Sequence, residues 1–130
     1  MTVNPAPADS GIVFRRIDLK GAPEVAALAH NVCDTSPGTP IKSGKAKVAT
    51  IEHILSALWT MGVDNATIDI DAPETPIMDG SAREYVAEIE RVGTTEQDAP
   101  RNYFSVEEEF CFEIPKKGVK VVISPAEEYS

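Results

Sequence analysis

The sequence predicts an α+β fold: a two-layer sandwich in which two helices cover one face of a mixed or antiparallel sheet, with a C-terminal β-hairpin added. Three segments support this prediction: a helical apolar stripe over 51–61, a strictly alternating strand over 65–71, and a second helical stripe over 85–92. Two amphipathic helices and a strand with one polar face need a common core, which a sheet covered on one side provides.

The first helix is predicted from apolar residues that recur at positions i, i+3, i+4 and i+7. These residues are Ile51, Ile54, Leu55, Leu58 and Met61. Thr50 is the expected N-cap, because its hydroxyl can accept a hydrogen bond from a free N–H group of the first turn. Gly62 is placed to end the helix in a left-handed conformation.

The segment after this helix alternates between apolar and polar residues, as a strand with one solvated face requires. Its inward positions are Ala66, Ile68 and Ile70. Ser81 is then expected to open the second helix through a capping box with Glu84, and Gly93 to end it. The apolar stripe of this second helix consists of Tyr85, Val86, Ile89 and Val92.

The N-terminal region has weaker patterns. The first ten residues are rich in Pro and small polar residues, so we expect an extended segment with an edge strand over 2–4. The segment 11–19 has strand character, and its expected buried positions are Phe14, Ile17 and Leu19. The segment 25–32 is a candidate second strand, although its alanines are also compatible with a helix.

The C-terminal region reads as a linker followed by a hairpin. Residues 94–102 are polar and contain a proline, which predicts a first domain over 1–97 and a remainder over 98–130. Strands are expected over 103–114 and 119–124, around a Pro-Lys-Lys-Gly turn. A single hairpin cannot form a domain. We therefore expect it to pack on the first domain, to pair with another copy, to need the rest of a second domain, or to remain loose.

A carboxylate and an imidazole lie next to each other at the start of the first helix. Glu52 and His53 are off the apolar stripe, and the positive end of the helix dipole favours an ionised carboxylate and a neutral imidazole. These are the states in which an imidazole binds Zn²⁺ and a carboxylate accepts a proton from water. Neighbouring helical residues point about 100° apart, so both could border one cavity. A solvated helix start that complements the dipole is the alternative.

Several motifs, in order, resemble the zinc amidases of lipid A biosynthesis, the UDP-3-O-acyl-N-acetylglucosamine deacetylase family, known as LpxC. The matching segments are Thr-Ile-Glu-His at 50–53 with Leu55, Ser56 and Ala57, the Gly-Val-Asp-Asn turn at 62–65, Ala-Pro-Glu-Thr-Pro-Ile-Met-Asp-Gly-Ser at 72–81, and a weaker match at 34–39. The resemblance implies that Glu52 is the general base and His53 one protein ligand of a catalytic Zn²⁺. Asp79 matches a family aspartate, and we expect it to support the site structurally as a turn and capping residue.

The sequence also departs from the family pattern. No glycine-rich loop resembling Gly-x-Gly-Leu-His-Thr-Gly precedes Gly11, so the chain is expected to begin late. The family's His-x-x-x-Asp motif and its later histidine are absent, and His30 lies in an unrelated context. Because a catalytic zinc usually takes three protein ligands, we expect an incomplete zinc site and a fragment that is inactive alone.

The resemblance implies that the intact enzyme removes acetate from UDP-3-O-(3-hydroxyacyl)-N-acetylglucosamine, with Glu52 taking the proton of the attacking water. Some family members are fused to a hydroxyacyl dehydratase, and the sequence leaves that question open. The alternative from another class is a non-catalytic α+β interaction module that uses an exposed strand edge to bind a partner.

Charge and hydropathy limit the classes of partner that the protein could bind. The formal net charge of −9 argues against nucleic acid, which needs a concentrated basic surface. The nearest basic cluster, Lys42, Lys45 and Lys47, is expected to be solvated, with contact to a nucleotide phosphate as the alternative. No apolar run approaches the roughly 20 residues of a membrane span, and no signal peptide is evident. The expected location is the cytoplasm.

The two cysteines are Cys33 and Cys111, which lie far apart and outside any zinc-binding spacing. Both are therefore expected to be reduced thiols. Cys111 alternates with Phe110 and Phe112 in the first strand of the expected hairpin, so we expect it to be a small core residue.

Overall fold

The computed structural model describes residues 1–34 and 38–127. The chain divides into two compact units, Met1–Ala99 and Pro100–Ser130. The sequence pattern places the corresponding boundary between residues 97 and 98.

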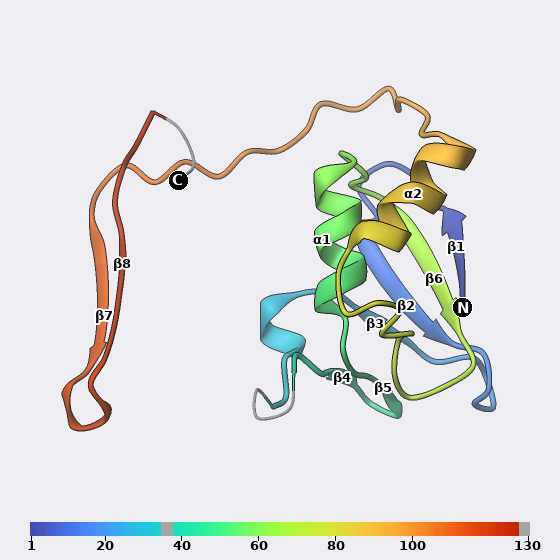
Figure 1. Cartoon of the computed structure of the whole chain (residues 1–130), viewed down its shortest axis with the longest axis horizontal. Helices are drawn as coiled ribbons and strands as arrows, with labels where there is room; N and C mark the ends of the chain where they lie inside the picture. Colours follow the sequence, from blue (N-terminus) through green and yellow to red (C-terminus); the bar gives the residue numbers. More distant parts are fainter. Residues whose placement is uncertain (35–37, 128–130) are drawn as a thin grey trace. The chain divides into compact units, whose positions relative to one another are not determined.

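The first unit is built on a mixed sheet of four strands (Figure 1). In sheet order they are β1 (Thr2–Pro5), β6 (Ala66–Ile70), β2 (Ile12–Arg16) and β3 (Glu24–Ala26). The two central strands are parallel, and each edge strand pairs antiparallel with its neighbour. The mixed sheet and the N-terminal edge strand agree with the prediction from the sequence.

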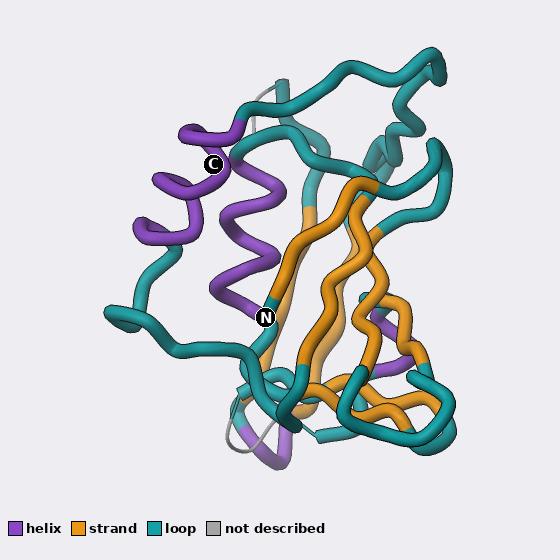
Figure 2. The backbone as a smooth tube through the Cα atoms, turned by 90° about the vertical axis from the view of Figure 1, so that its right-hand side faces the viewer, coloured by secondary structure: helices purple, strands orange, loops and turns teal. Residues whose placement is uncertain are grey.

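Two helices lie on one face of this sheet, α1 (Glu52–Thr60) and α2 (Arg83–Val92), as Figure 2 shows. The core lies between the two layers. Its largest fully buried side chains include Phe14, Ile54, Leu58 and Ile68, and Tyr85 joins it from α2. Ala66, Ile68 and Ile70 face this core from β6, so the predicted α+β sandwich with two helices on one face is confirmed.

The helix ends follow the expected glycines, but the helix starts do not follow the expected caps. Gly62 and Gly93 follow the two helices with φ of +68° and +80°. At the other ends, the N-cap residues are Ile51 and Ala82, and neither makes a side-chain capping bond.

Both predicted N-caps were therefore wrong, because their hydroxyls have other partners. Thr50 donates to the Glu74 carboxylate. The hydroxyl of Ser81 donates to Asp79 and accepts from the backbone N–H of Arg83 rather than forming a capping box with Glu84.

The remaining elements of the first unit are short. The antiparallel pair β4 (Ile41–Ser43) and β5 (Ala46–Val48) leads into α1, and η1 (Ala29–Asn31) is a 3₁₀ turn. The candidate strand over 25–32 is thus only partly right. The strand β3 ends at Ala26, and the chain then turns, with the Asn31 side chain donating to the Ala26 carbonyl at 2.9 Å.

Two positions that we expected to be buried are exposed. Ile17 is 52% exposed because Arg16, whose side chain is held by Asp18 and by the Lys47 carbonyl, takes the inward position at the end of β2. Val92 is 70% exposed at the last turn of α2.

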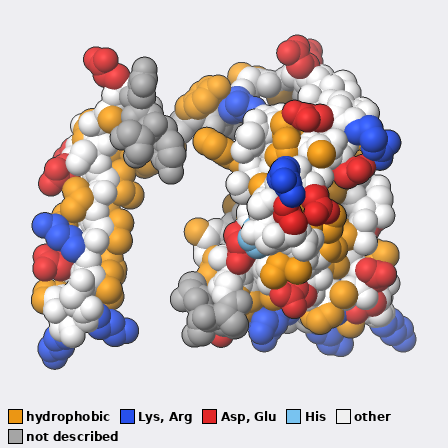
Figure 3. Space-filling model, in the orientation of Figure 1, with side chains coloured by type: hydrophobic (Ala, Val, Ile, Leu, Met, Phe, Trp, Pro, Cys, Tyr) orange, Lys and Arg blue, Asp and Glu red, His pale blue; other side chains and the backbone are white. Residues whose placement is uncertain are grey.

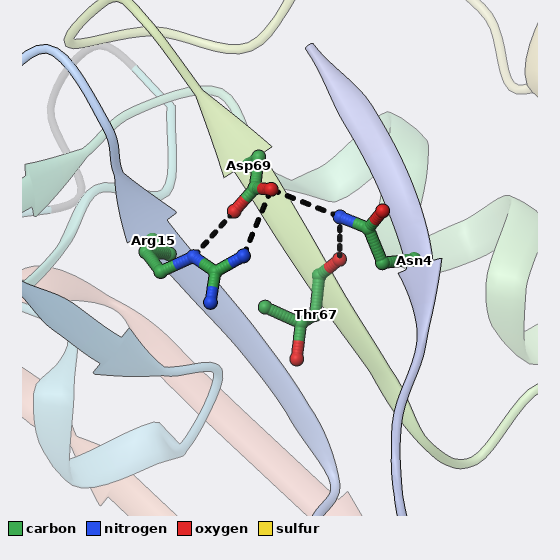
Figure 4. A network of polar contacts seen from close by, with 4 residues as sticks. All are labelled: Asn4, Arg15, Thr67 and Asp69. Atoms are coloured by element: carbon green, nitrogen blue, oxygen red, sulfur yellow. Dashed lines mark hydrogen bonds and ion pairs between the residues drawn. The ribbon is translucent and has the colours of Figure 1, made fainter. Parts of the chain in front are cut away.

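The outer face of the sheet carries a polar network rather than a second layer (Figure 4). Asp69 on β6 accepts two hydrogen bonds from Arg15 on β2, at 2.6 and 2.9 Å. Asn4 on β1 donates to Asp69 at 3.0 Å and to the Thr67 carbonyl at 3.3 Å. The network therefore links three neighbouring strands across the solvated side of the sheet.

The second unit contains a hairpin of β7 (Phe110–Ile114) and β8 (Val119–Ile123), joined by the 3₁₀ turn η2 (Pro115–Lys117). The predicted hairpin and turn are confirmed, although β7 begins at Phe110 rather than at residue 103. Cys111 was expected in a core and is exposed, because a two-stranded sheet leaves both of its faces open. Cys33 is also exposed, and both thiols are free.

Candidate functional site

Glu52 and His53 are the first two residues of α1, and both side chains are half-buried. Ile51 and Ile54 are 2% and 1% exposed, and their burial determines which side of the helix faces the core. Because these two residues face the core, Glu52 and His53 lie beside the buried stripe, as the apolar spacing predicts.

The Glu52 carboxylate is the unusual group of this helix start. Its Oε2 atom is buried and has no hydrogen-bond partner among the described residues. Buried polar atoms in folded proteins nearly always have a partner, so each exception calls for an explanation. A carboxylate oxygen kept away from protein donors is free to accept a proton or to bind a group from outside the chain.

Gly38 lies against the same carboxylate. Its φ is +110°, a conformation that L-residues rarely adopt, and a Cβ at this position would lie 3.1 Å from Glu52 Oε1. The same Cβ would lie 3.9 Å from Thr50 Oγ1. The backbone at residue 38 thus passes so close to Glu52 that only a residue without a side chain fits there unstrained.

The residues just before α1 are held by a second loop. Backbone bonds join Ala49 to this loop: its N–H donates to Pro73 O at 2.9 Å, and its carbonyl accepts from Thr75 N–H at 3.1 Å. The Thr50 hydroxyl donates to Glu74 Oε1, and the Thr75 hydroxyl donates to the Thr50 carbonyl. We refer to these contacts of Ala49 and Thr50 with residues 73–75 as the clasp.

The clasp holds Thr50 in an uncommon backbone conformation. Its φ is +58°, which is a genuine outlier for a β-branched residue. Such a conformation costs about 1–3 kcal/mol and persists only where surrounding contacts hold it. Thr50 is 7% exposed and Thr75 is 2% exposed, so the bond between these two residues is buried, whereas the bond from Thr50 to the exposed Glu74 is only partly buried.

Asp79 makes the contacts of a turn residue. It accepts from the backbone N–H of Ser81 at 3.0 Å, from the Ser81 hydroxyl at 2.8 Å and from Arg83 at 2.8 Å. The hydrogen bond from the Ser81 hydroxyl is the main reason that the pKa of Asp79 is below its usual value. These partners all lie close to Asp79 in sequence and precede or begin α2, and its expected support of the site stays a prediction.

Other candidates lie apart from this arrangement. His30 is exposed in η1. Lys42, Lys45 and Lys47 are exposed on the β4–β5 pair, and Figure 3 shows Lys and Arg side chains along this lower edge of the first unit. The matching loop 34–39 lies partly outside the described residues, because positions 35–37 are not among them.

The residues at the start of α1 supply only part of what a metal site requires. The His53 imidazole could supply one ligand, and the Oε2 of Glu52, which lacks a partner within residues 1–34 and 38–127, would suit a base in such a site. Within residues 1–34 and 38–127, however, no three His, Cys, Asp or Glu side chains are grouped so that they could hold a metal ion. A zinc here would need further ligands from outside the described part of the chain.

Sequence patterns alone did not identify Thr50 and Gly38 as parts of this arrangement. Thr50 was interpreted as a helix cap, which uses the same hydroxyl for a different bond. The available signal was the pairing of two matching motifs, 50–53 and 72–81, whose residues make the clasp.

Comparison with known proteins supports the resemblance drawn from these motifs. The profile of the family described as "LpxC: UDP-3-O-acyl N-acetylglycosamine deacetylase" matches residues 1–130. A "Bifunctional enzyme LpxC/FabZ" of Porphyromonas gingivalis is 45% identical over 130 residues, which is all of this chain and 28% of that protein.

Two further relatives, shorter than the first, share one name. The "UDP-3-O-acyl-N-acetylglucosamine deacetylase" of Legionella pneumophila is 43% identical over 132 residues, covering 95% of this chain and 43% of that protein. The protein of the same name in Cellvibrio japonicus is 48% identical over 109 residues, covering 84% of this chain and 36% of that protein. The chain therefore spans less than half the length of the relatives that it matches.

Proposed function

Because the chain belongs to the LpxC family of UDP-3-O-acyl N-acetylglycosamine deacetylases, we propose that it forms part of a zinc-dependent enzyme that removes acetate from UDP-3-O-(3-hydroxyacyl)-N-acetylglucosamine. In this proposal Glu52 is the general base and His53 is one zinc ligand. The enzyme acts in lipid A biosynthesis, in the cytoplasm, on a UDP-linked acylated glucosamine.

The observation that carries the proposal is the buried Oε2 of Glu52, which has no hydrogen-bond partner among the described residues and belongs to the residue before His53 at the start of α1. A surface carboxylate that merely complements the helix dipole would be solvated.

The residues have separate tasks in the reaction. Glu52 accepts a proton from the water whose oxygen attacks the acetamide carbonyl carbon. The amide C–N bond then breaks as a proton is delivered to the departing nitrogen, which gives acetate and the free amine. The ring of His53 would supply one nitrogen ligand to the metal, and a bound metal would supply Lewis acidity that polarises the carbonyl and lowers the pKa of water. Gly38 leaves room beside the carboxylate, and Asp79 shapes the turn that precedes α2.

A zinc site at Glu52 and His53 needs further protein ligands. One imidazole and one base do not make a catalytic zinc site, which usually has three protein ligands. The remaining ligands come from the part of the enzyme that the relatives have beyond this match. The 130-residue chain by itself is therefore inactive in this proposal.

The deciding experiment uses the full-length protein that contains this chain. Replacing Glu52→Gln removes the proton acceptor and keeps the shape, so kcat should fall by about 10²- to 10⁴-fold. Acetate release from the UDP-linked substrate is the measurement. Glu90→Gln on the exposed face of α2 is the matched control and should leave the rate unchanged. A Glu52→Gln enzyme as active as the parent would refute the assignment.

Zinc titration of the 130-residue chain by calorimetry tests the assignment of His53 separately. We expect no tight binding, because the described residues offer no group of three ligands. Stoichiometric binding by the monomer that is lost in His53→Ala would show that the chain holds a complete site.

A second candidate function rests on the hairpin. Phe110, Phe112, Val121 and Ile123 are 60%, 50%, 49% and 47% exposed, and the register places these residues in facing pairs on one side of it. Such an apolar face is what an interaction module would present to a partner. Failure of the full-length parent protein to release acetate from the UDP-linked substrate would favour this candidate over the enzyme.

A further inference from the structure

The backbone immediately before Glu52 is held under strain. Thr50 has a φ of +58°, and it is separated from Glu52 by Ile51 alone. Strain of this kind in β-branched residues gathers at sites whose geometry has a function, and surrounding contacts must maintain it. The contacts that maintain it here are those of the clasp with residues 73–75.

The clasp holds Thr50 through two groups, its side-chain hydroxyl and its backbone carbonyl. The side-chain hydroxyl donates to Glu74, while the backbone carbonyl accepts from the Thr75 hydroxyl. The loop that supplies these partners is itself fixed, because the Tyr85 hydroxyl on α2 donates to the Pro76 carbonyl. A chain of contacts therefore runs from α2, through the loop, to Thr50, two residues before the start of α1.

The Thr50 hydroxyl and the Glu52 carboxylate both lie near the backbone of Gly38. An atom at the Cβ position of Gly38 would lie 3.9 Å from Thr50 Oγ1 and 3.1 Å from Glu52 Oε1. Thr50 gives its proton to Glu74, and Glu52 Oε2 is left without a partner among the described residues. The Thr50 hydroxyl is thus engaged by Glu74 and does not donate its proton to Glu52.

We propose that Thr50 is a positioning residue: its backbone conformation, held by Glu74 and Thr75, sets the direction of the Glu52 carboxylate and keeps its Oε2 free of protein donors. The kinetic consequence rests on the proposed function, in which Glu52 is the base. The geometric claim stands on the contacts alone, and so the two can fail separately.

The first test measures geometry in the 130-residue chain. Thr50→Val keeps the branched shape and loses the hydroxyl, whereas Thr50→Ser keeps the hydroxyl. Side-chain three-bond couplings and the carboxyl ¹³C shift of Glu52 are measured by NMR. We expect one rotamer in the parent and in Thr50→Ser, and averaged rotamers in Thr50→Val.

Glu74 provides a second pair of variants in case Thr50→Val does not fold. Glu74 is exposed, so its replacement does not open the core. Glu74→Ala should release the Glu52 rotamer, whereas Glu74→Gln retains an acceptor oxygen and should behave as the parent does. An unchanged Glu52 signal in the folded Thr50→Val or Glu74→Ala chains would overturn the proposal.

The second test measures turnover in the full-length protein. Misplacing a catalytic group by about 1 Å can cost about 100-fold, so Thr50→Val should lower kcat by about 10- to 100-fold with little change in KM. Thr50→Ser should recover most of that loss. Normal kcat in Thr50→Val, with Glu52→Gln inactive, would refute positioning while leaving the base in place. If Glu52→Gln is active, the proposed function fails, and the NMR measurement still decides the geometry.

Discussion

At the residue scale, the site depends on how closely one backbone segment approaches one carboxylate. The distance of 3.1 Å between a Cβ at Gly38 and Glu52 Oε1 is shorter than an ordinary van der Waals contact. Glu52 cannot shift freely to avoid it, because its Oε2 is already buried. The conformation of the loop and the position of the base are therefore coupled.

Gly38→Ala tests this coupling. The new methyl group meets the Glu52 carboxylate, and φ of +110° is unfavourable for alanine, so we expect a fall in kcat of about tenfold or more in the full-length protein. Gly44→Ala is the matched control, because Gly44 also has a positive φ, +53°, and a Cβ there meets nothing within 4 Å. Equal effects of the two replacements on kcat would show that backbone strain, and not contact with Glu52, is responsible.

At the element scale, the outer face of the sheet is held by charge and hydrogen bonds instead of apolar packing. The hydrogen bonds from Arg15 are the main reason that the pKa of Asp69 lies below its usual value of 3.8. An Asp whose pKa is depressed in the folded state contributes stability above its unfolded pKa, and that contribution is lost as pH falls through the folded value.

Asp69→Asn should therefore change how stability depends on pH. Above pH 4 the parent should be more stable than the variant, and the difference should shrink as the pH falls below the unfolded pKa of about 3.8. Urea denaturation over a series of pH values measures it. Asp98→Asn, at an exposed position in the same unit, should follow the parent at every pH. A difference for Asp69→Asn that does not vary with pH would contradict the ionic explanation.

At the scale of the whole molecule, the core belongs to the first unit. Its buried members extend from Phe14 to Tyr85, and the last partly buried side chain packed against them is Ile89. Within the described residues neither helix has the length and hydropathy of a membrane span. The hairpin of the second unit contributes none of the residues in this core cluster.

A chain that ends at Ala99 should therefore retain the fold of the first unit. We expect the thermal midpoint and the amide exchange protection of β6 to match those of the 130-residue chain, because every core contact is kept. Calorimetry and hydrogen exchange measure them. A clearly lower midpoint would show that residues after Ala99 stabilise the first unit.

How much could be predicted from the sequence differs between the fold and the site. The period of the apolar residues over 51–61 and the alternation over 65–71 identified α1 and β6, because burial on one face imposes these periods. Thr50 and Ser81 were misassigned, since a hydroxyl before a helix can serve a cap or a distant partner equally well. Ile17 was misassigned because a paired arginine, Arg16, could take the inward position.

Local patterns were enough to predict the two-layer architecture, the family and the adjacent residues Glu52 and His53, since periodicity and contiguous motifs are local properties of the chain. The three-dimensional packing was needed to find that Gly38 lies against Glu52 and that residues 73–75 hold Thr50. These contacts join segments separated by many residues. Their geometry depends on how the sheet and helices pack, which no local pattern encodes.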